Sequence, residues 1–292
     1  GTEYYLPAGS SYRVTPFALM KGFRLAGSRD GVKPIVVLEG SWSIAEGSYL
    51  SSLEFDNIEF RHEANNNYFM NTSKAYTIEN VSFVNCDFIS LRRGFWRHQS
   101  ANAKYIMNLE MEGCRFEGCG WQTSAYGAFN LQSFDKDNGV SYDQVDRAIF
   151  RNCTFSNDND GTNGYGWGNL FYAPYMDKPI DLEYKNVTIY NYSRNQRLIN
   201  IESAVGSKLV MEGILLASPC GDLFAIGANT TTTFSNNYTT ADYTLGGKNM
   251  NATDLKITAA ELFADPANGD LTIKDTSSPI VSNRAGDTRW LP

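Results

Sequence analysis

The chain has 292 residues, of which 42% are hydrophobic and 20% charged, so it can build a large core and is not a disordered sequence. Its formal net charge is -7, and its 25 Lys and Arg residues form no basic stripe of the kind that neutralises nucleic-acid phosphates. No apolar run approaches the roughly 18 to 20 residues that span a bilayer. We therefore expect a folded protein with no nucleic-acid partner and no transmembrane segment.

The first fifty residues alternate short apolar runs with Gly and Pro, which predicts short strands separated by tight turns. We assign residues 1–50 to an N-terminal cap and opening coil. No signal-peptide pattern opens the chain, and we interpret Gly1 as a cloning remnant. Any secretion signal or lipid anchor is then expected to lie outside this sequence.

One phrase, L-E-F-D-N-I-E-F from Leu53 to Phe60, returns in altered form five times. Its central Asn or Gly recurs at Asn57, Asn85, Gly113, Asn152, Asn186 and Gly213. A second apolar phrase follows each copy and begins at Tyr68, Phe95, Ala128, Leu170, Leu198 and Leu223. The repeats leave no room for helices and are mostly too short for propeller blades. They predict an all-β, single-stranded, right-handed parallel β-helix, with coils over 51–257 and a C-terminal cap of a short helix and strand over 258–292, all in one continuous domain.

The fixed Asn or Gly of the phrase has an architectural explanation. Both residue types tolerate the left-handed backbone of a sharp bend, and stacked Asn side chains can hydrogen-bond from coil to coil. Cys86, Cys114 and Cys153 share one repeat position, which predicts stacked core thiols and not metal ligands or disulfides.

The third and fourth coils carry extra residues between the two phrases, and this edge is rich in aromatics. Loops longer than a repeat requires are where solenoids commonly place function. Aromatic faces stack on pyranose rings, although such rings can equally pin a long loop to the coil surface. The aromatic residues of this edge are Trp121, Tyr126, Tyr165, Trp167, Tyr190 and Tyr192. A further insertion follows over Phe134 to Arg147.

The second phrase supplies a polar column if its residues alternate between core and solvent. Such a column could fix the hydroxyls or uronates of a polysaccharide, although outward positions are polar in any soluble protein. The outward residues are predicted to be Met70, Arg97, Asn130, Tyr172 and Asn200, then Thr72, Gln99, Gln132, Pro174 and Glu202. His98 should point inward as a satisfied core histidine.

Chemistry beyond binding is only weakly indicated. The acidic pairs Asp135 with Asp137 and Asp158 with Asp160 invite a metal, but the second places Trp167 where a calcium loop needs a bidentate Glu. We therefore assign no metal site, with Asp158 and Asp160 as the nearest candidates. No repeated phrase offers an unmistakable carboxylate pair. Arg97 and Glu202 are the only catalytic candidates, no cofactor is expected, and calcium would accompany only a lyase activity.

Particular runs suggest a family. These are K-P-I-V-V-L-E-G before the first full phrase, L-F-A-D-P-A-N-G-D-L-T-I-K, and the closing A-G-D-T-R-W. In these runs the sequence resembles the pectate-lyase-like parallel β-helix proteins of unknown function that Bacteroidetes encode in polysaccharide-utilisation loci, often as surface lipoproteins following an immunoglobulin-like domain. The pectate-lyase and polygalacturonase signatures, such as R-x-P-x-x-R, are not evident in this chain.

The resemblance implies a polysaccharide or oligosaccharide partner and an extracellular or outer-membrane surface location. The first functional hypothesis is a polysaccharide-binding β-helix involved in glycan capture or utilisation. The alternatives are a polysaccharide lyase or hydrolase acting on an acidic glycan, and a structural spacer or adhesin. We lean towards a non-enzyme and expect a monomer.

Overall fold

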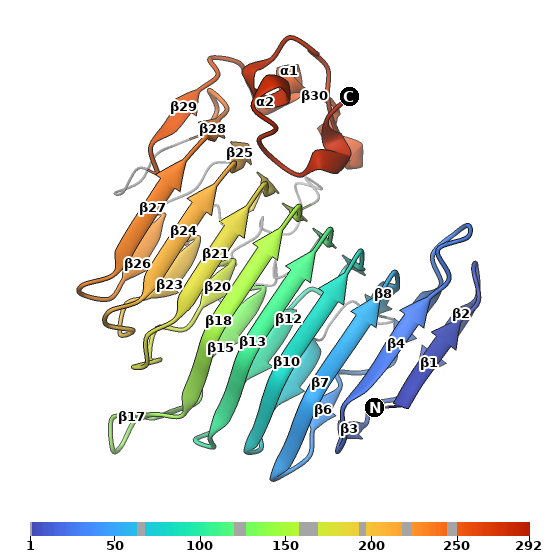
Figure 1. The fold of residues 1–292 in the computed structure, drawn as a ribbon, viewed down its shortest axis with the longest axis vertical. Helices are drawn as coiled ribbons and strands as arrows, with labels where there is room; N and C mark the ends of the chain where they lie inside the picture. The colour runs from blue at the N-terminus through green and yellow to red at the C-terminus, as the bar shows by residue number, and fades with distance from the viewer. Residues whose placement is uncertain are drawn as a thin grey trace.

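In the computed structural model, the described residues are 2–62, 68–119, 127–157, 169–192, 197–217, 223–243 and 250–292. They form three long sheets in which every pairing is parallel and the strands follow one another in chain order (Figure 1). Such sheets arise when each turn of a solenoid adds one strand to each of them. The predicted parallel β-helix is therefore confirmed. No helix among these residues is long and apolar enough to cross a membrane.

We call the three sheets sheet 1, sheet 2 and sheet 3. Sheet 1 contains β1 (Thr2–Leu6), β4 (Phe23–Gly27), β7 (Ser48–Asp56), β10 (Tyr76–Val84), β13 (Lys104–Glu112), β18 (Asp143–Arg151), β21 (Asp181–Lys185), β24 (Lys208–Glu212) and β27 (Thr231–Ser235). Sheet 2 contains β2 (Ser11–Val14), β5 (Ile35–Leu38), β8 (Glu59–His62), β11 (Asp87–Ile89), β14 (Arg115–Glu117), β19 (Thr154–Ser156), β22 (Thr188–Tyr190), β25 (Leu215–Ala217), β28 (Asn237–Thr239) and β29 (Ala252–Asp254). Sheet 3 contains β9 (Tyr68–Thr72), β12 (Gly94–His98), β15 (Phe129–Leu131), β20 (Phe171–Tyr172), β23 (Ile199–Ile201) and β26 (Phe224–Ile226).

Short elements complete the chain. In the first two coils, β3 (Ala18–Leu19) pairs with β6 (Ser43–Ile44) in a small parallel sheet. The predicted insertion after the third coil is a hairpin of β16 (Phe134–Asp135) and β17 (Val140–Ser141). The C-terminal segment holds α1 (Ala259–Leu262), β30 (Phe263–Asp265), the 3-10 turn η1 (Pro266–Asn268), β31 (Asp270–Ile273), α2 (Pro279–Ser282) and the 3-10 turn η2 (Thr288–Trp290).

The corner between sheet 1 and sheet 2 is the left-handed bend that the repeated Asn or Gly predicts. Asn57 and Asn85 have φ angles of 55° and 52°, and Gly113 and Gly213 have 64° and 66°. The Asn85 amide donates to Asn57 Oδ1 at 2.6 Å, so the expected coil-to-coil hydrogen bond is present. At Gly213 an added Cβ would collide with the side-chain oxygen of Asn186, which explains why that coil has no side chain there.

The interior consists of apolar columns that run along the solenoid axis. Phe55 stacks on Phe83 with ring centroids 4.7 Å apart, and Phe150 stacks on Tyr184 at 4.5 Å. Four cysteines among the described residues are buried and form no disulfide, namely Cys86, Cys114, Cys119 and Cys153. Burial raises the pKa of Cys86 and Cys153 well above the ordinary value, so both are neutral thiols, as the repeat predicts.

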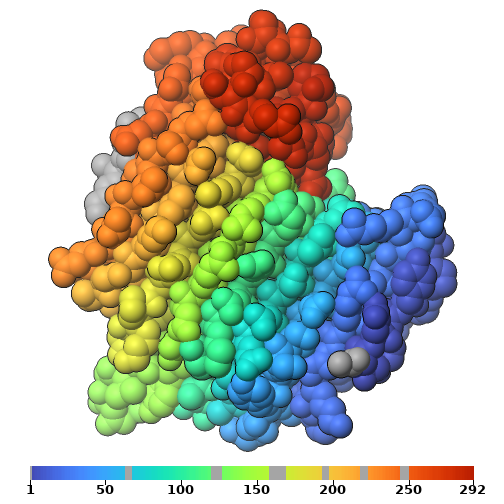
Figure 2. Space-filling model, viewed as in Figure 1, coloured from blue at the N-terminus to red at the C-terminus, as the bar shows by residue number. Residues whose placement is uncertain are grey.

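The C-terminal segment begins with the predicted capping box, in which Thr258 and Glu261 satisfy each other's backbone N–H groups. We expected this segment to seal the end of the helix, and that remains a prediction. In the structure its last residues pack on sheet 2, where Asp287 accepts a hydrogen bond from Thr154 Oγ1 at 2.7 Å and the Trp290 indole donates to the same hydroxyl at 2.8 Å. Figure 2 shows these last residues, in red, against the orange, yellow and green coils.

Candidate functional site on the outer face of sheet 3

One ladder of residues crosses sheet 3 from β9 to β23. Asn71 pairs with Arg97, Arg97 with Asn130, Asn130 with Tyr172, and Tyr172 with Asn200. Four of these five residues are those of the predicted outward column, and we call the ladder the sheet 3 column. It lies on the side of sheet 3 opposite the buried Trp96 and Phe129.

Two predicted orientations at the start of the column are wrong. Met70 pairs with Trp96 and is fully buried, because the two phrases align one position later than their first residues suggest. A slip of one residue moves every side chain to the other face of a strand, so Asn71 occupies the place assigned to Met70. Thr72 is buried for the same reason, and Pro174 is buried as well.

Asn130 is the most unusual member of the column. The sequence predicts an exposed polar residue, but Asn130 is only 1% exposed and neither its amide nitrogen nor its amide oxygen has a hydrogen-bond partner. Most buried polar side chains are satisfied, because an unmade hydrogen bond costs about 1–3 kcal/mol. Asn200, also buried, differs in that its Oδ1 accepts from the backbone N–H of Glu202 at 3.3 Å. Asn130 therefore retains a free donor and a free acceptor at the centre of the column.

Arg97 and Tyr172 flank Asn130 on the neighbouring strands. The Arg97 guanidinium carbon lies 5.5 Å from the centroid of the Tyr68 ring, a cation–π contact that orients the side chain across the sheet. Tyr172 is half-buried, and burial, reinforced by nearby Tyr175 and Glu202, raises the pKa of its phenol. The phenol is therefore a neutral hydrogen-bonding group near pH 7.

Farther along the edge, Glu202 is exposed and forms an ion pair with Arg197 at 3.6 Å. Gln99 and Gln132 are partly exposed just beyond β12 and β15, as predicted. Phe134 of the β16–β17 hairpin stacks on Tyr175 with ring centroids 4.3 Å apart. The sequence did not predict this ring pair. Its only signal was the insertion over Phe134 to Arg147, which contains one of the two rings.

A buried polar network supports the sheet 3 column from the inside. His98 Nδ1 lies 2.6 Å from Asp143 Oδ1, and its Nε2 lies 2.6 Å from the Tyr76 hydroxyl. Because a carboxylate only accepts, the imidazole donates from Nδ1 and accepts the tyrosine proton at Nε2. Asp143 also accepts from the Ser133 backbone N–H at 2.6 Å, and Trp96 donates to Tyr76 at 3.3 Å. The predicted satisfied core histidine is thus confirmed.

Lys104 joins this network with all three ammonium hydrogens used. It donates to Ser133 Oγ at 2.5 Å and to the carbonyls of Asn102 and Ser100 at 2.7 and 3.2 Å. Burial lowers the pKa of Lys104 to about 8, an effect that Asp143 opposes. Burial likewise lowers the pKa of His98 and raises that of Tyr76, so imidazole and phenol are both neutral near pH 7.

Several predicted site residues lie outside the described residues, and they are Trp121, Tyr126, Tyr165, Trp167, Asp158 and Asp160. Two aromatics assigned to the same edge have packing roles, since Tyr192 is fully buried and Tyr190 packs edge-on against Phe263. Asp135 accepts hydrogen bonds from the backbone of Asp137 and Asn138, as in a turn. Within the described ranges, no three His, Cys, Asp or Glu side chains are grouped to hold a metal.

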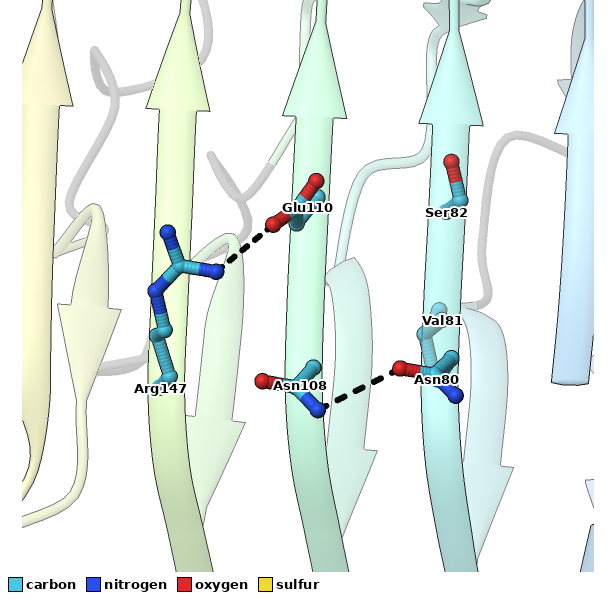
Figure 3. A pocket seen from close by; sticks show the side chains of 6 residues that line it. All are labelled: Asn80, Val81, Ser82, Asn108, Glu110 and Arg147. Carbon is cyan, nitrogen blue, oxygen red and sulfur yellow. Dashed lines mark hydrogen bonds and ion pairs between the residues drawn. The ribbon is translucent and has the colours of Figure 1, made fainter. Parts of the chain in front are cut away.

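A second polar region lies on the outer face of sheet 1. A shallow hollow of about 340 Å³ is lined by Asn80, Val81, Ser82, Asn108, Glu110 and Arg147 (Figure 3). Its polar groups pair with one another, since Arg147 donates to Glu110 at 2.7 Å and Asn108 to Asn80 at 3.2 Å. A self-paired surface offers less to a ligand than the free amide of Asn130.

The class that this architecture defines is the parallel β-helix. Comparison with known proteins adds nothing narrower, because no family model and no curated protein matches the chain.

Proposed function

We propose that the protein binds a polysaccharide or oligosaccharide along the sheet 3 column. Asn130 carries the proposal, because its amide can donate to one sugar hydroxyl and accept from the next while it is held rigidly in a strand. Arg97 and Tyr172 add polar groups one strand away on either side, at the ~4.8 Å spacing of paired strands. An extended ligand lying across the strands would meet Arg97 and Tyr172 directly, and to reach the 1% exposed Asn130 it would have to displace the protein atoms that cover this amide.

Aromatic surface beside the column supports a sugar more than a peptide or a small anion. The Phe134 and Tyr175 pair lies on the hairpin side, close enough for Tyr175 to act on the pKa of Tyr172. Carbohydrate sites combine such apolar ring surface with hydrogen-bonding groups. The resemblance to surface proteins of Bacteroidetes polysaccharide-utilisation loci supports the same proposal. We also propose an extracellular or outer-membrane location on that ground.

We propose binding and not cleavage because of the state of Glu202. It is exposed and paired with Arg197, whereas a glycosidase needs two carboxyl groups facing each other across the scissile bond. Arg97 remains a candidate for holding a uronate carboxylate, for which its guanidinium is suited.

The test is a glycan array followed by affinity gel electrophoresis on the best polysaccharide. Asn130→Ala should weaken binding at least ~10-fold, the effect of losing about one hydrogen bond with its neighbours. The matched control is Asn108→Ala on sheet 1, which should bind like the wild type. Equal binding by both variants would contradict the proposed site, and the absence of any glycan ligand would favour a structural spacer. Release of unsaturated or reducing sugars would instead show a lyase or hydrolase.

A further inference from the structure

The two terminal segments of the chain pack differently. The C-terminal segment, with α1, β30 and β31, lies against sheet 2 and forms a second apolar cluster with Leu215 and Tyr238. At the N-terminal end, the described residues place no further strand beside β1 and β2, which are the first strands of sheets 1 and 2 (Figure 1). Their outer ladder groups therefore face away from the other described strands.

Among the described residues, no strand covers the interior of the helix on the N-terminal side of the first coil. An apolar hollow of about 460 Å³ enters the core there and reaches Trp42 and Val36, which are themselves 2% exposed. The side chains around its mouth come from the first twenty-five residues and include Tyr4, Leu6, Tyr12, Val14, Phe17 and Phe23. In later coils the equivalent surface is covered by the preceding coil, as β4 covers β7 and β7 covers β10 in sheet 1.

Exposed apolar residues gather at this same end. Of the ten large hydrophobic side chains that are exposed among the described residues, five lie within the first twenty positions, and they are Tyr4, Tyr5, Tyr12, Phe17 and Met20. Tyr4 is 54% and Tyr5 63% exposed. A concentrated apolar patch on a soluble protein marks an interaction surface.

The charged side chains of β1, β2 and β4 at this end form ion pairs within the chain. Glu3 pairs with Arg24, which also contacts Asp56 at 3.2 Å, and Glu39 pairs with Arg13 at 3.2 Å. A net charge of -7 opposes self-association elsewhere on the surface, but here two copies could meet without like charges in contact.

We propose that this open end binds a second copy of the chain head to head, with β1 of one copy antiparallel to β1 of its partner. A two-fold axis at Tyr4 would place Tyr4 opposite Tyr4 and Glu3 opposite Tyr5, so no carboxylate faces another. The pairing satisfies the outer ladder of β1 and continues sheet 1, while the Tyr4–Phe23 ring contact extends across the interface. We choose a second copy as the partner because the edge strand, the apolar face and the paired charges at this end can each match themselves across a two-fold axis.

Sedimentation equilibrium or light scattering across a concentration series tests the state directly. Twice the chain mass of 32.6 kDa is expected. Tyr4→Lys should raise the dimer dissociation constant roughly 30-fold or more, as expected for a central aromatic anchor. The matched control is Tyr49→Lys, because Tyr49 is 59% exposed on the outer face of β7. A monomer at every concentration, which the sequence predicted, overturns the proposal, and so does a dimer that both variants retain.

A cysteine substitution tests the register. Residues directly opposite in an antiparallel pair have Cα atoms about 4.5–5.5 Å apart, within disulfide range. Tyr4→Cys should therefore oxidise to a covalent dimer on a non-reducing gel, and Tyr49→Cys should stay monomeric. Tyr12→Lys provides a second disrupting variant, and circular dichroism shows whether each variant is folded. Failure of Tyr4→Cys to cross-link in a dimeric sample overturns the proposed β1 pairing.

Discussion

The outer faces of sheets 1 and 3 are both polar, but their polar groups are in opposite states. On sheet 1, Arg147 and Glu110 or Asn108 and Asn80 satisfy each other at the surface. On sheet 3, Asn130 is buried with both amide atoms free, above a core that itself holds a charged network. Polar composition alone therefore does not mark a site. The distinction is whether hydrogen-bonding capacity is used up within the protein.

The largest expected contrast comes from the network beneath sheet 3. Asp143→Ala removes the acceptor of both His98 and the Ser133 backbone and leaves Lys104 without its nearby counter-charge. We expect a loss of about 3–5 kcal/mol in the free energy of unfolding, as for other broken buried ion pairs.

The control for that variant is Asp146→Ala, in the same strand but exposed on sheet 1. It should cost no more than about 1 kcal/mol. Urea denaturation measures the free energy of unfolding of both variants. Similar losses would mean that the buried network contributes no more to stability than an exposed carboxylate of sheet 1.

Asn130→Val should separate stability from function. Replacing an unsatisfied buried amide by an apolar side chain suited to a strand should stabilise the fold by about 1–2 kcal/mol while abolishing glycan binding. Asn108→Val on sheet 1 should change stability by no more than about 0.5 kcal/mol. Chemical denaturation combined with affinity electrophoresis makes the comparison. A destabilised Asn130→Val variant would show that this amide has an internal structural role.

A smaller effect should follow the pH. The pKa of His98 is lowered from 6.5 in the folded protein by burial, against the opposing pull of Asp143, so below pH 6.5 the unfolded chain binds more protons than the folded one. Stability that is fully present above pH 6.5 should decrease as the pH falls below it. His98→Gln should reduce this slope between pH 7 and 5.5 in denaturation experiments. Identical slopes for wild type and variant would assign the pH dependence to other groups.

The smallest effect is expected at the exposed ion pair of sheet 1. Arg147→Ala should lower the free energy of unfolding by less than about 1 kcal/mol, with the difference shrinking in high salt. Glycan binding should be unchanged in affinity electrophoresis. A clear loss of binding would move the site from sheet 3 to the hollow on sheet 1.

The architecture was predictable because its determinants are local. An Asn or Gly at a fixed position of the repeat, such as Asn57 or Gly113, predicts a left-handed corner. The alternation of apolar residues on either side of it predicts which side chains point into the core. The same reading placed Met70 on the wrong face, since two phrases of similar composition can be aligned in either of two adjacent registers.

The candidate site was predictable in its members but not in its state. Arg97, Asn130 and Tyr172 follow from alternation, whereas the burial of Asn130 depends on what lies over the sheet, which alternation does not record. Lys104 and Asp143 were missed because each reads as an ordinary polar residue at the start of a strand. Only the parallel pairing of their strands brings them onto one network, and the two positions are indeed register partners.

The left-handed corner also determines how such a chain can change over evolutionary time. Every full coil returns to the same register there, so sheets 1 and 2 keep their alignment however many residues the other two corners contain. The β16–β17 hairpin is an example, because it lengthens one coil while β13 and β18 still pair without a shift. Insertions or deletions beside sheet 3 could therefore change the ligand preference one coil at a time, with little loss of fold stability.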